Sequence, residues 1–242
     1  MAIIDTRKFL IHASFVGDSD FLRPFAILDL FQDEASVHAD ILHLGYNDMI
    51  KKNLLWIVNY QEIDIVGELP KYTDEVMVST WPHRRNRLDY VREYDIKDMN
   101  GNLLVTGIAS WFTIDSTARK LVKDDNVSFG EEYYEYTNYP DFKRRKVNLT
   151  PTDDAITWDY QVTYTDLDHN DHMNNAKYLD VIYNRHIGTP INKIKKIIIS
   201  FSHEIKFGEI INMTYFRNEN NDSCYIGKVN DIECFSVIME EK

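Results

Sequence analysis

The chain has 242 residues and a formal net charge of -12 at pH 7. This length suffices for one large domain or two small ones, and the acidic balance argues against a nucleic-acid-binding protein. The longest apolar runs are far too short to span a bilayer. Residues 1–10 do not resemble a secretory signal. We therefore expect neither a membrane protein nor a secreted one.

The first half of the chain begins with a predicted strand and a long helix. Apolar side chains alternate onto one face over residues 9–13, as in a strand. A helix is predicted over residues 24–44, because Pro24 suits a first helical turn and Gly45 suits a helix end. The helix is so apolar that we expect a sheet to wrap around it.

Strands follow this helix. Asn100 and Gly101 give a strong hairpin signal between two of them. The predicted strands cover residues 54–65, 75–81, 88–96 and 103–114. The first half is therefore predicted as one helix followed by an antiparallel sheet, over residues 1–135.

Residues 136–154 differ in composition from both flanking regions. They are rich in tyrosine, aspartate and basic residues and contain Pro140 and Pro151. Such composition is typical of a segment between domains rather than of a core element. We interpret this segment as a linker and residues 155–242 as a second domain.

The second half repeats the first half at an offset of 151 residues. Phe9 and Ile11 fall on Tyr160 and Val162, and residues 28–31 fall on residues 179–182. Strands are again predicted after the helix, over residues 194–207, 209–217, 224–229 and 232–239. The order of elements repeats, although few letters do.

The two cysteines, Cys224 and Cys234, flank a predicted hairpin turn at Asn230 and Asp231. A two-residue turn there would place Cys224 opposite Val237 rather than opposite Cys234. We therefore expect no disulfide, as in proteins of a reducing compartment.

The most polar stretch of the chain, residues 166–175, reads DLDHNDHMNN. A strand-like segment precedes it and a helical run follows it. The free backbone N–H groups of a helix start suit a developing negative charge. Three interpretations compete: a solvated helix cap, a calcium loop, and a catalytic loop with His172 as the acid/base group.

Metal binding fits this stretch poorly. Asp166, Asp168 and Asn170 match the first ligand positions of an EF-hand loop, but Asp171 replaces its glycine and Lys177 its final glutamate. Two histidines are too few for zinc, and no cysteine lies near. We predict no metal site, which leaves the cap and the catalytic loop.

The residues around His172 resemble the active-site motif of the plant-type acyl-acyl carrier protein (acyl-ACP) thioesterases and their bacterial relatives. Asp168, Asn170, His172, Asn174 and Asn175 match the motif D-x-N-x-H-x-N-N. In that family the motif opens the second of two hotdog domains. A later glutamate, often followed by cysteine, completes the site.

Two further residues bear on the same resemblance. Glu204 stands at the place of the family glutamate and Ile205 at the place of the cysteine. Ile205 rules out a cysteine nucleophile at this position and favours water as the attacking group. Weaker matches extend over nearly the whole chain, at residues 31–39, 56–58, 80–81, 111–115 and 119–121.

The resemblance implies an α+β fold, a tandem double hotdog in which each half is a long helix wrapped by an antiparallel sheet. At the offset of 151, Asp168, Asn170 and His172 fall on Gly17, Ser19 and Phe21. The first half therefore lacks the catalytic set, and we expect it to supply a binding surface.

The resemblance also implies roles for the site residues, without a cofactor. Glu204 would orient and polarise the water, while His172 shares that task or donates to the carbonyl or the leaving sulfur. Asp168 would fix the imidazole, and Asn170 would hold the carbonyl or the water. Backbone donors near Asn174 and Asn175 could form an oxyanion hole. His169 and His203 are expected to be bystanders.

The implied reaction is hydrolysis of fatty acyl-ACP, which releases a free fatty acid and ends chain elongation, in the cytoplasm. We expect the acyl chain to lie in the first half. The side chains predicted to contact it are Ile27, Leu30, Phe31, Trp56 and Val58.

Acyl carrier proteins are themselves acidic, so a basic cluster would have to dock this partner. The candidates are Arg84, Arg85 and Arg87; Lys143, Arg144, Arg145 and Lys146; and Lys193, Lys195 and Lys196. Two alternatives stay open: an acyl-CoA thioesterase, and a non-catalytic hotdog protein that binds acyl thioesters. A regulator of the second kind should carry a helix-turn-helix and a basic face, which the sequence does not show. Chain-length preference and homodimer formation also stay open.

Overall fold

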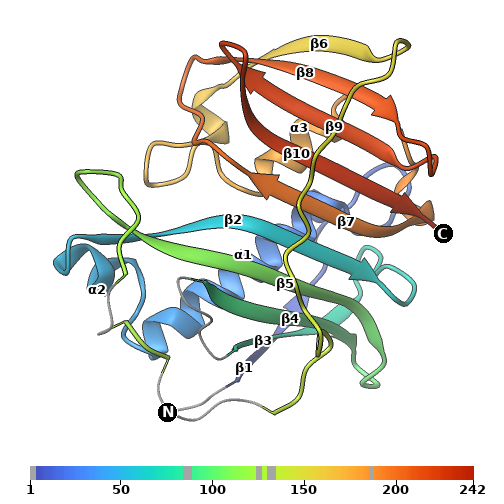
Figure 1. Ribbon diagram of the computed structural model, residues 1–242. Coiled ribbons are helices and arrows are strands. Elements are labelled where there is room, and N and C mark those ends of the chain that lie inside the picture. The colour runs from blue at the N-terminus through green and yellow to red at the C-terminus, as the bar shows by residue number, and fades with distance from the viewer. Residues whose placement is uncertain (1–3, 84–88, 124–126, 130–134, 186–187) are drawn as a thin grey trace.

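The computed structural model describes residues 4–83, 89–123, 127–129, 135–185 and 188–242. Within these residues the strands form one ten-stranded antiparallel sheet, in the order β1-β3-β4-β5-β2-β7-β10-β9-β8-β6 (Figure 1). The strands are β1 (Asp5–Leu10), β2 (Leu54–Ile65), β3 (Glu75–Pro82), β4 (Tyr90–Asp98), β5 (Leu103–Asp115), β6 (Ile156–Gln161), β7 (Ile194–Phe201), β8 (Ile210–Arg217), β9 (Ser223–Val229) and β10 (Ile232–Glu241). Read outward from its centre, each half of the sheet has the same order, so the predicted tandem double hotdog is confirmed.

The long helix α1 (Pro24–Ile41) ends before the predicted residue 44. His43 has a positive φ of 57°, the left-handed conformation that commonly closes a helix. Gly45 does not end α1. It has a φ of -70° and precedes a second helix, α2 (Tyr46–Lys51), which the sequence analysis missed.

Helix α1 packs against the inner face of the first-half strands (Figure 1). Ile27 and Leu30 are fully buried there. The Phe31 ring stacks on Tyr94 with the ring centroids 4.5 Å apart, and it lies directly over Gly107, where any side chain would overlap it. The helix can approach the sheet this closely because Gly107 has no side chain.

The repeat holds in three dimensions at the predicted offset of 151 residues. Strands β1 and β6 begin and end at equivalent positions. The loop after each strand is closed by an equivalent bridge, Val16 to Leu22 in the first half and Leu167 to Met173 in the second. The two halves therefore share the backbone of the loop that carries the polar stretch.

The second-half helix α3 (Lys177–Tyr183) is shorter than predicted, with 7 residues against 18 in α1. Gly188, which has a φ of 93°, and Pro190 follow soon after it, and neither residue continues a helix. Strand β7 is also shorter than predicted, so Glu204 lies on the loop after it.

The two halves are joined through β2 and β7, which pair from Tyr60 and Ser200 to Asp64 and Lys196. The Lys196 ammonium lies 2.9 Å from Glu62 Oε2 and 2.8 Å from Asp64 Oδ1, and its side chain is only 13% exposed. Residues 143–154 have no helix or strand, and the segment before β6 crosses the outer face of the sheet (Figure 1). There the Tyr139 hydroxyl donates to Asp64 Oδ2 at 2.8 Å.

Replacement of Lys196 tests how much this junction contributes. Lys196→Met should lower the free energy of unfolding by about 3 kcal/mol, because two part-buried carboxylates lose their shared cation. Urea unfolding followed by circular dichroism measures the loss. The exposed neighbour Lys195 provides the control, and Lys195→Met should change stability by less than about 0.5 kcal/mol. Equal losses of stability in the two variants would contradict the stabilising role of Lys196 at the β2–β7 junction.

Candidate active site

The polar loop that follows β6 is held by local hydrogen bonds. The Asp166 carboxylate accepts from the Thr163 N–H at 2.7 Å, the Thr163 hydroxyl at 2.8 Å and the Tyr160 hydroxyl at 2.9 Å. The Asp168 N–H donates to the His172 carbonyl at 2.8 Å, which closes the loop on itself. Asp166 therefore shapes the loop rather than lining the cavities described below.

Asp168 binds Asn170 and not the imidazole that the sequence analysis assigns to it. Its Oδ1 accepts from the Asn170 N–H at 2.7 Å, and its Oδ2 lies 3.5 Å from Asn170 Nδ2. A carboxylate that receives the N–H two residues further on is a common local turn. Asp168 therefore fixes the backbone at Asn170 and so positions the Asn170 side chain.

The carboxylate beside the imidazole is that of Glu204. His172 Nε2 lies 3.5 Å from Glu204 Oε2, and the two side chains are 16% and 40% exposed. The other oxygen, Oε1, accepts a hydrogen bond from Arg119 Nη2. Arg119 belongs to the first half, on the turn that follows β5, so the two halves meet at this carboxylate.

The imidazole keeps capacity for a ligand. Its Nδ1 is buried and has no hydrogen-bond partner among the described residues. The separation of 3.5 Å between Nε2 and Glu204 Oε2 lies just beyond a direct hydrogen bond. One water molecule or one substrate atom can therefore lie within hydrogen-bonding distance of both groups.

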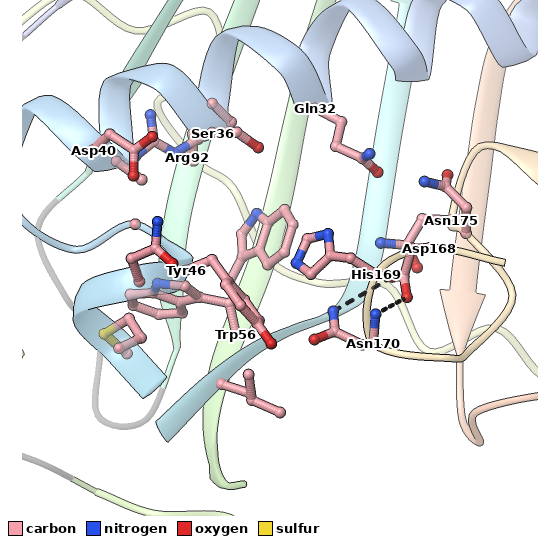
Figure 2. A pocket seen from close by; sticks show the side chains of 18 of the residues that line it. Gln32, Ser36, Asp40, Tyr46, Trp56, Arg92, Asp168, His169, Asn170 and Asn175 are labelled. Carbon is pink, nitrogen blue, oxygen red and sulfur yellow. Dashed lines mark hydrogen bonds between the residues drawn. The ribbon is translucent and has the colours of Figure 1, made fainter. Parts of the chain in front are cut away.

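Two cavities adjoin this pair. The first, here called the slot, has a volume of about 400 Å³ and lies beneath α1 (Figure 2). The second, here called the cleft, has a volume of about 360 Å³ and contains His172, Glu204 and Arg119 in its walls. Leu55, Trp56, Asp168, Asn170 and Asn175 line both cavities, so the slot opens into the cleft at the polar loop.

The first half of the chain lines the slot mainly with apolar side chains, and Gln32, Ser36, Asp40 and Arg92 add polar groups. Trp56 donates from Nε1 to the Leu44 carbonyl at 2.8 Å, which fixes its indole, and Phe129 stacks on it with the centroids 6.2 Å apart. Further apolar lining comes from Ala35, Ala39, Met49, Leu55 and Trp111. Both the size and the lining suit an apolar ligand.

This slot corrects part of the predicted acyl-binding set. Trp56 lines both cavities and Val58 lines the cleft, so both are accessible to a ligand. Ile27, Leu30 and Phe31 line neither; they lie in the core at 0%, 1% and 2% exposure. The helix turns a different face, with Gln32, Ala35, Ser36 and Ala39, towards the slot (Figure 2).

The remaining predicted residues occupy different positions. The Asn174 N–H donates to the Asp166 carbonyl at 2.8 Å, and its Oδ1 accepts from the Ala176 N–H at 2.8 Å. The Asn174 N–H is therefore already used and does not contribute to an oxyanion hole. His169, expected to be a bystander, lies in the slot against Tyr46 of α2, with the ring centroids 4.3 Å apart. His203 is exposed, and its Nδ1 lies 3.0 Å from the Glu233 carbonyl.

Neither the contact of Arg119 with Glu204 nor helix α2 was predicted from the sequence. Arg119 lies in a segment already matched to the family, but its distance along the chain from Glu204 hid the pairing. Tyr46 was hidden because residues 24–44 were predicted as a single helix with a stop at Gly45. Over the described part of the chain, no group of three His, Cys, Asp or Glu side chains could hold a metal ion.

Two family models together match most of the chain. The model of the acyl-ACP thioesterase N-terminal domain matches residues 5–128, and that of the C-terminal domain matches residues 149–235. The chain belongs to the acyl-ACP thioesterase family. No helix in the described ranges is long and apolar enough to cross a membrane.

Individual acyl-ACP thioesterases show the same relationship. The palmitoyl-acyl carrier protein thioesterase of Arabidopsis thaliana is 28% identical over 190 residues, which are 73% of this chain and 46% of that protein. The chain thus spans about half the length of the curated relatives that it matches.

Solved structures share the fold. An acyl-ACP thioesterase from Bacteroides thetaiotaomicron superposes with a TM-score of 0.85 at 20% identity, covering 99% of this chain and 98% of that one. The 12:0-ACP thioesterase from Umbellularia californica gives a TM-score of 0.84 at 18% identity, covering 100% and 98%.

The cysteines lie away from both cavities. They are free and buried, and Cys224 pairs with Ile238 rather than with the predicted Val237, because a bulge between Glu233 and Phe235 shifts the register by one residue. Burial raises the pKa of Cys224 to about 11 and also raises the pKa of Cys234.

Both thiols should therefore resist modification in the folded protein. A disulfide reagent at pH 8 should label them far more slowly than in the urea-unfolded chain, because the thiolate is both scarce and inaccessible. The absorbance of the released thiolate measures the rate. Rapid labelling of either cysteine in the folded protein would contradict this expectation.

Proposed function

We propose that this protein hydrolyses the thioester of fatty acyl-acyl carrier protein and releases the free fatty acid, which ends acyl chain elongation. The observation that carries the proposal is the His172–Glu204 pair, held by Arg119, in the cleft into which the slot opens. Family membership supports the same reaction. We further propose a cytoplasmic location, which two free cysteines support.

The chemistry begins with a water held between His172 and Glu204. Glu204 takes one proton as the water oxygen attacks the thioester carbonyl carbon. Charge then builds on the carbonyl oxygen, and in this scheme the Asn170 carboxamide donates a hydrogen bond to it. The carbon–sulfur bond breaks, and the imidazolium form of His172 gives its Nε2 proton to the leaving sulfur and becomes neutral. The proton that Glu204 took from the water then passes to His172 directly or through solvent, which restores both groups.

The first half supplies the acyl-binding surface in this proposal. Its slot takes the acyl chain against Trp56, Trp111 and Phe129, and the thioester lies where the slot meets the cleft. The carrier protein then covers the mouth of the cleft.

The basic residues of this chain that could dock the carrier protein differ in how exposed they are. Lys193 and Lys195 are exposed, whereas Lys196 is paired with Glu62 in the β2–β7 junction. The cluster of Arg84, Arg85 and Arg87 lies outside the described residues.

Substitution of the pair tests the reaction. His172→Ala and Glu204→Gln should each lower kcat by about 100-fold or more, since a positioned acid or base contributes at least that much. Release of free fatty acid from purified acyl-ACP measures the rate, with the matching acyl-CoA as a comparison substrate. Glu219→Gln, on an exposed turn, is the carboxylate control. Turnover near wild type in either site variant would overturn the assignment.

A second pair of variants tests the position of the acyl chain. Trp56→Ala should move the preference towards longer chains, because contacts the size of a methylene group change discrimination by roughly 1–3 kcal/mol. Phe31→Ala should instead cost about 3–5 kcal/mol of stability and lower all activities alike, because Phe31 is core. Profiles of kcat/KM against acyl length, taken with thermal unfolding, separate the two. An unchanged profile for Trp56→Ala would place the chain elsewhere.

A further inference from the structure

Asn59 occupies an irregular position in β2, beside the cleft. Along β2 the pairing with β5 runs from Val58 and Trp111 directly to Tyr60 and Ser110, so a bulge leaves Asn59 without a partner residue. A bulge redirects a side chain that strict alternation would send to the other face. Asn59 lines the cleft together with Val58, while Tyr60 bonds Glu62 and the linker on the outer face.

The Asn59 side chain leaves a polar atom unused. Its Oδ1 is buried and has no hydrogen-bond partner within the described part of the chain. A buried polar atom without a partner destabilises a fold by roughly 1–3 kcal/mol. Because this unpartnered oxygen lies in the wall of the cleft that contains His172 and Glu204, we expect a ligand to supply the missing hydrogen-bond donor.

The reaction requires an acceptor of this kind. A nucleophilic water has two protons, and in the proposed function Glu204 takes only one of them. The second proton needs an acceptor that holds the water in line with the carbonyl carbon. The His172 Nε2–H is a donor in the same scheme, and the guanidinium of Arg119 has donors only.

We propose that Asn59 is a further catalytic residue, whose Oδ1 accepts a hydrogen bond from the second O–H of the attacking water. The inference rests on the proposed hydrolysis. No proton is transferred to Asn59: one O–H bond breaks towards Glu204, and the other O–H is retained in the product carboxyl group. The first half of the chain would thereby contribute to the chemistry as well as to acyl binding.

Leucine substitution separates catalysis from structure. Asn59→Leu should lower kcat on acyl-ACP about 10-fold, the equivalent of one hydrogen bond, with little change in KM. Its Tm should equal or exceed that of wild type, since an apolar side chain removes an unsatisfied buried atom. A structural role for the amide would instead lower Tm and leave kcat in place.

Gln61 offers a matched control on the same strand. Its Oε1 is also buried and unpartnered among the described residues, but Gln61 lines neither cavity. Gln61→Leu should keep kcat at the wild-type value. Equal losses of kcat in Asn59→Leu and Gln61→Leu would overturn the proposal, as would wild-type kcat in Asn59→Leu.

A smaller pair covers the case in which the leucine variant does not fold. Asn59→Ser retains a hydroxyl acceptor and Asn59→Ala does not, so the serine variant should be several-fold faster. Equal rates in the two would overturn the role of Asn59. The activity of the wild-type protein on the same substrate separates failure of the proposed hydrolysis from failure of the Asn59 proposal. An inactive wild type refutes the proposed hydrolysis. An active wild type with unaffected Asn59 variants refutes only the role of Asn59.

Discussion

The pairing of β2 with β7 is the constraint on which the rest of the structure depends. It joins two similar sheets into one, and its last pair is Tyr60 with Ser200. Beyond that pair the bulge at Asn59 begins on one strand, and β7 ends at Phe201 on the other. The cleft opens where the ladder stops. The site therefore lies at the boundary of the two halves and takes side chains from both.

The two halves share one loop backbone, but only the second half carries the residues of the proposed reaction. Phe21 and His172 occupy equivalent positions in the two halves. Each forms an isolated backbone β-bridge with a lysine of its own half: Phe21 with Lys71, and His172 with Lys206. In the first half the lysine lies over the Phe21 ring, 5.0 Å from its centroid. In the second half the imidazole faces Glu204 instead. The same loop therefore closes the first half, and in the second half it carries His172 of the proposed reacting pair.

The sequence predicted the fold well because the signals were local. Turn residues and alternation located β2 and the Asn100-Gly101 hairpin closely, and a repeat at a fixed offset indicated two copies. Side-chain partners were predicted less well. Asp168 was predicted to accept a hydrogen bond from the His172 imidazole, but its carboxylate accepts one from the Asn170 N–H, two residues away. Glu204 contacts Arg119, which lies far away in the chain, and no local sequence pattern predicts such a contact.

Apolar residues show a second limit of sequence-based prediction. Phe31 and Trp56 are both large and aromatic, and both were predicted to line the acyl slot. The residue type does not tell a core position from a slot-lining position, because both are built from the same large apolar residue types. What separates them is what lies opposite: Gly107 and Tyr94 fill the space beside Phe31, whereas the space beside Trp56 is left open.

The position after Glu204 shows why water suits this site. Ile205 is fully buried in the main hydrophobic core and lines neither cavity. Its carbonyl accepts from the Met173 N–H at 2.8 Å, which fixes the backbone beside the polar loop. Any side chain at this position, including a thiol, would point into the core while Glu204 points into the cleft. A nucleophile at residue 205 would require the backbone to turn over, whereas a water between His172 and Glu204 requires no rearrangement of the backbone.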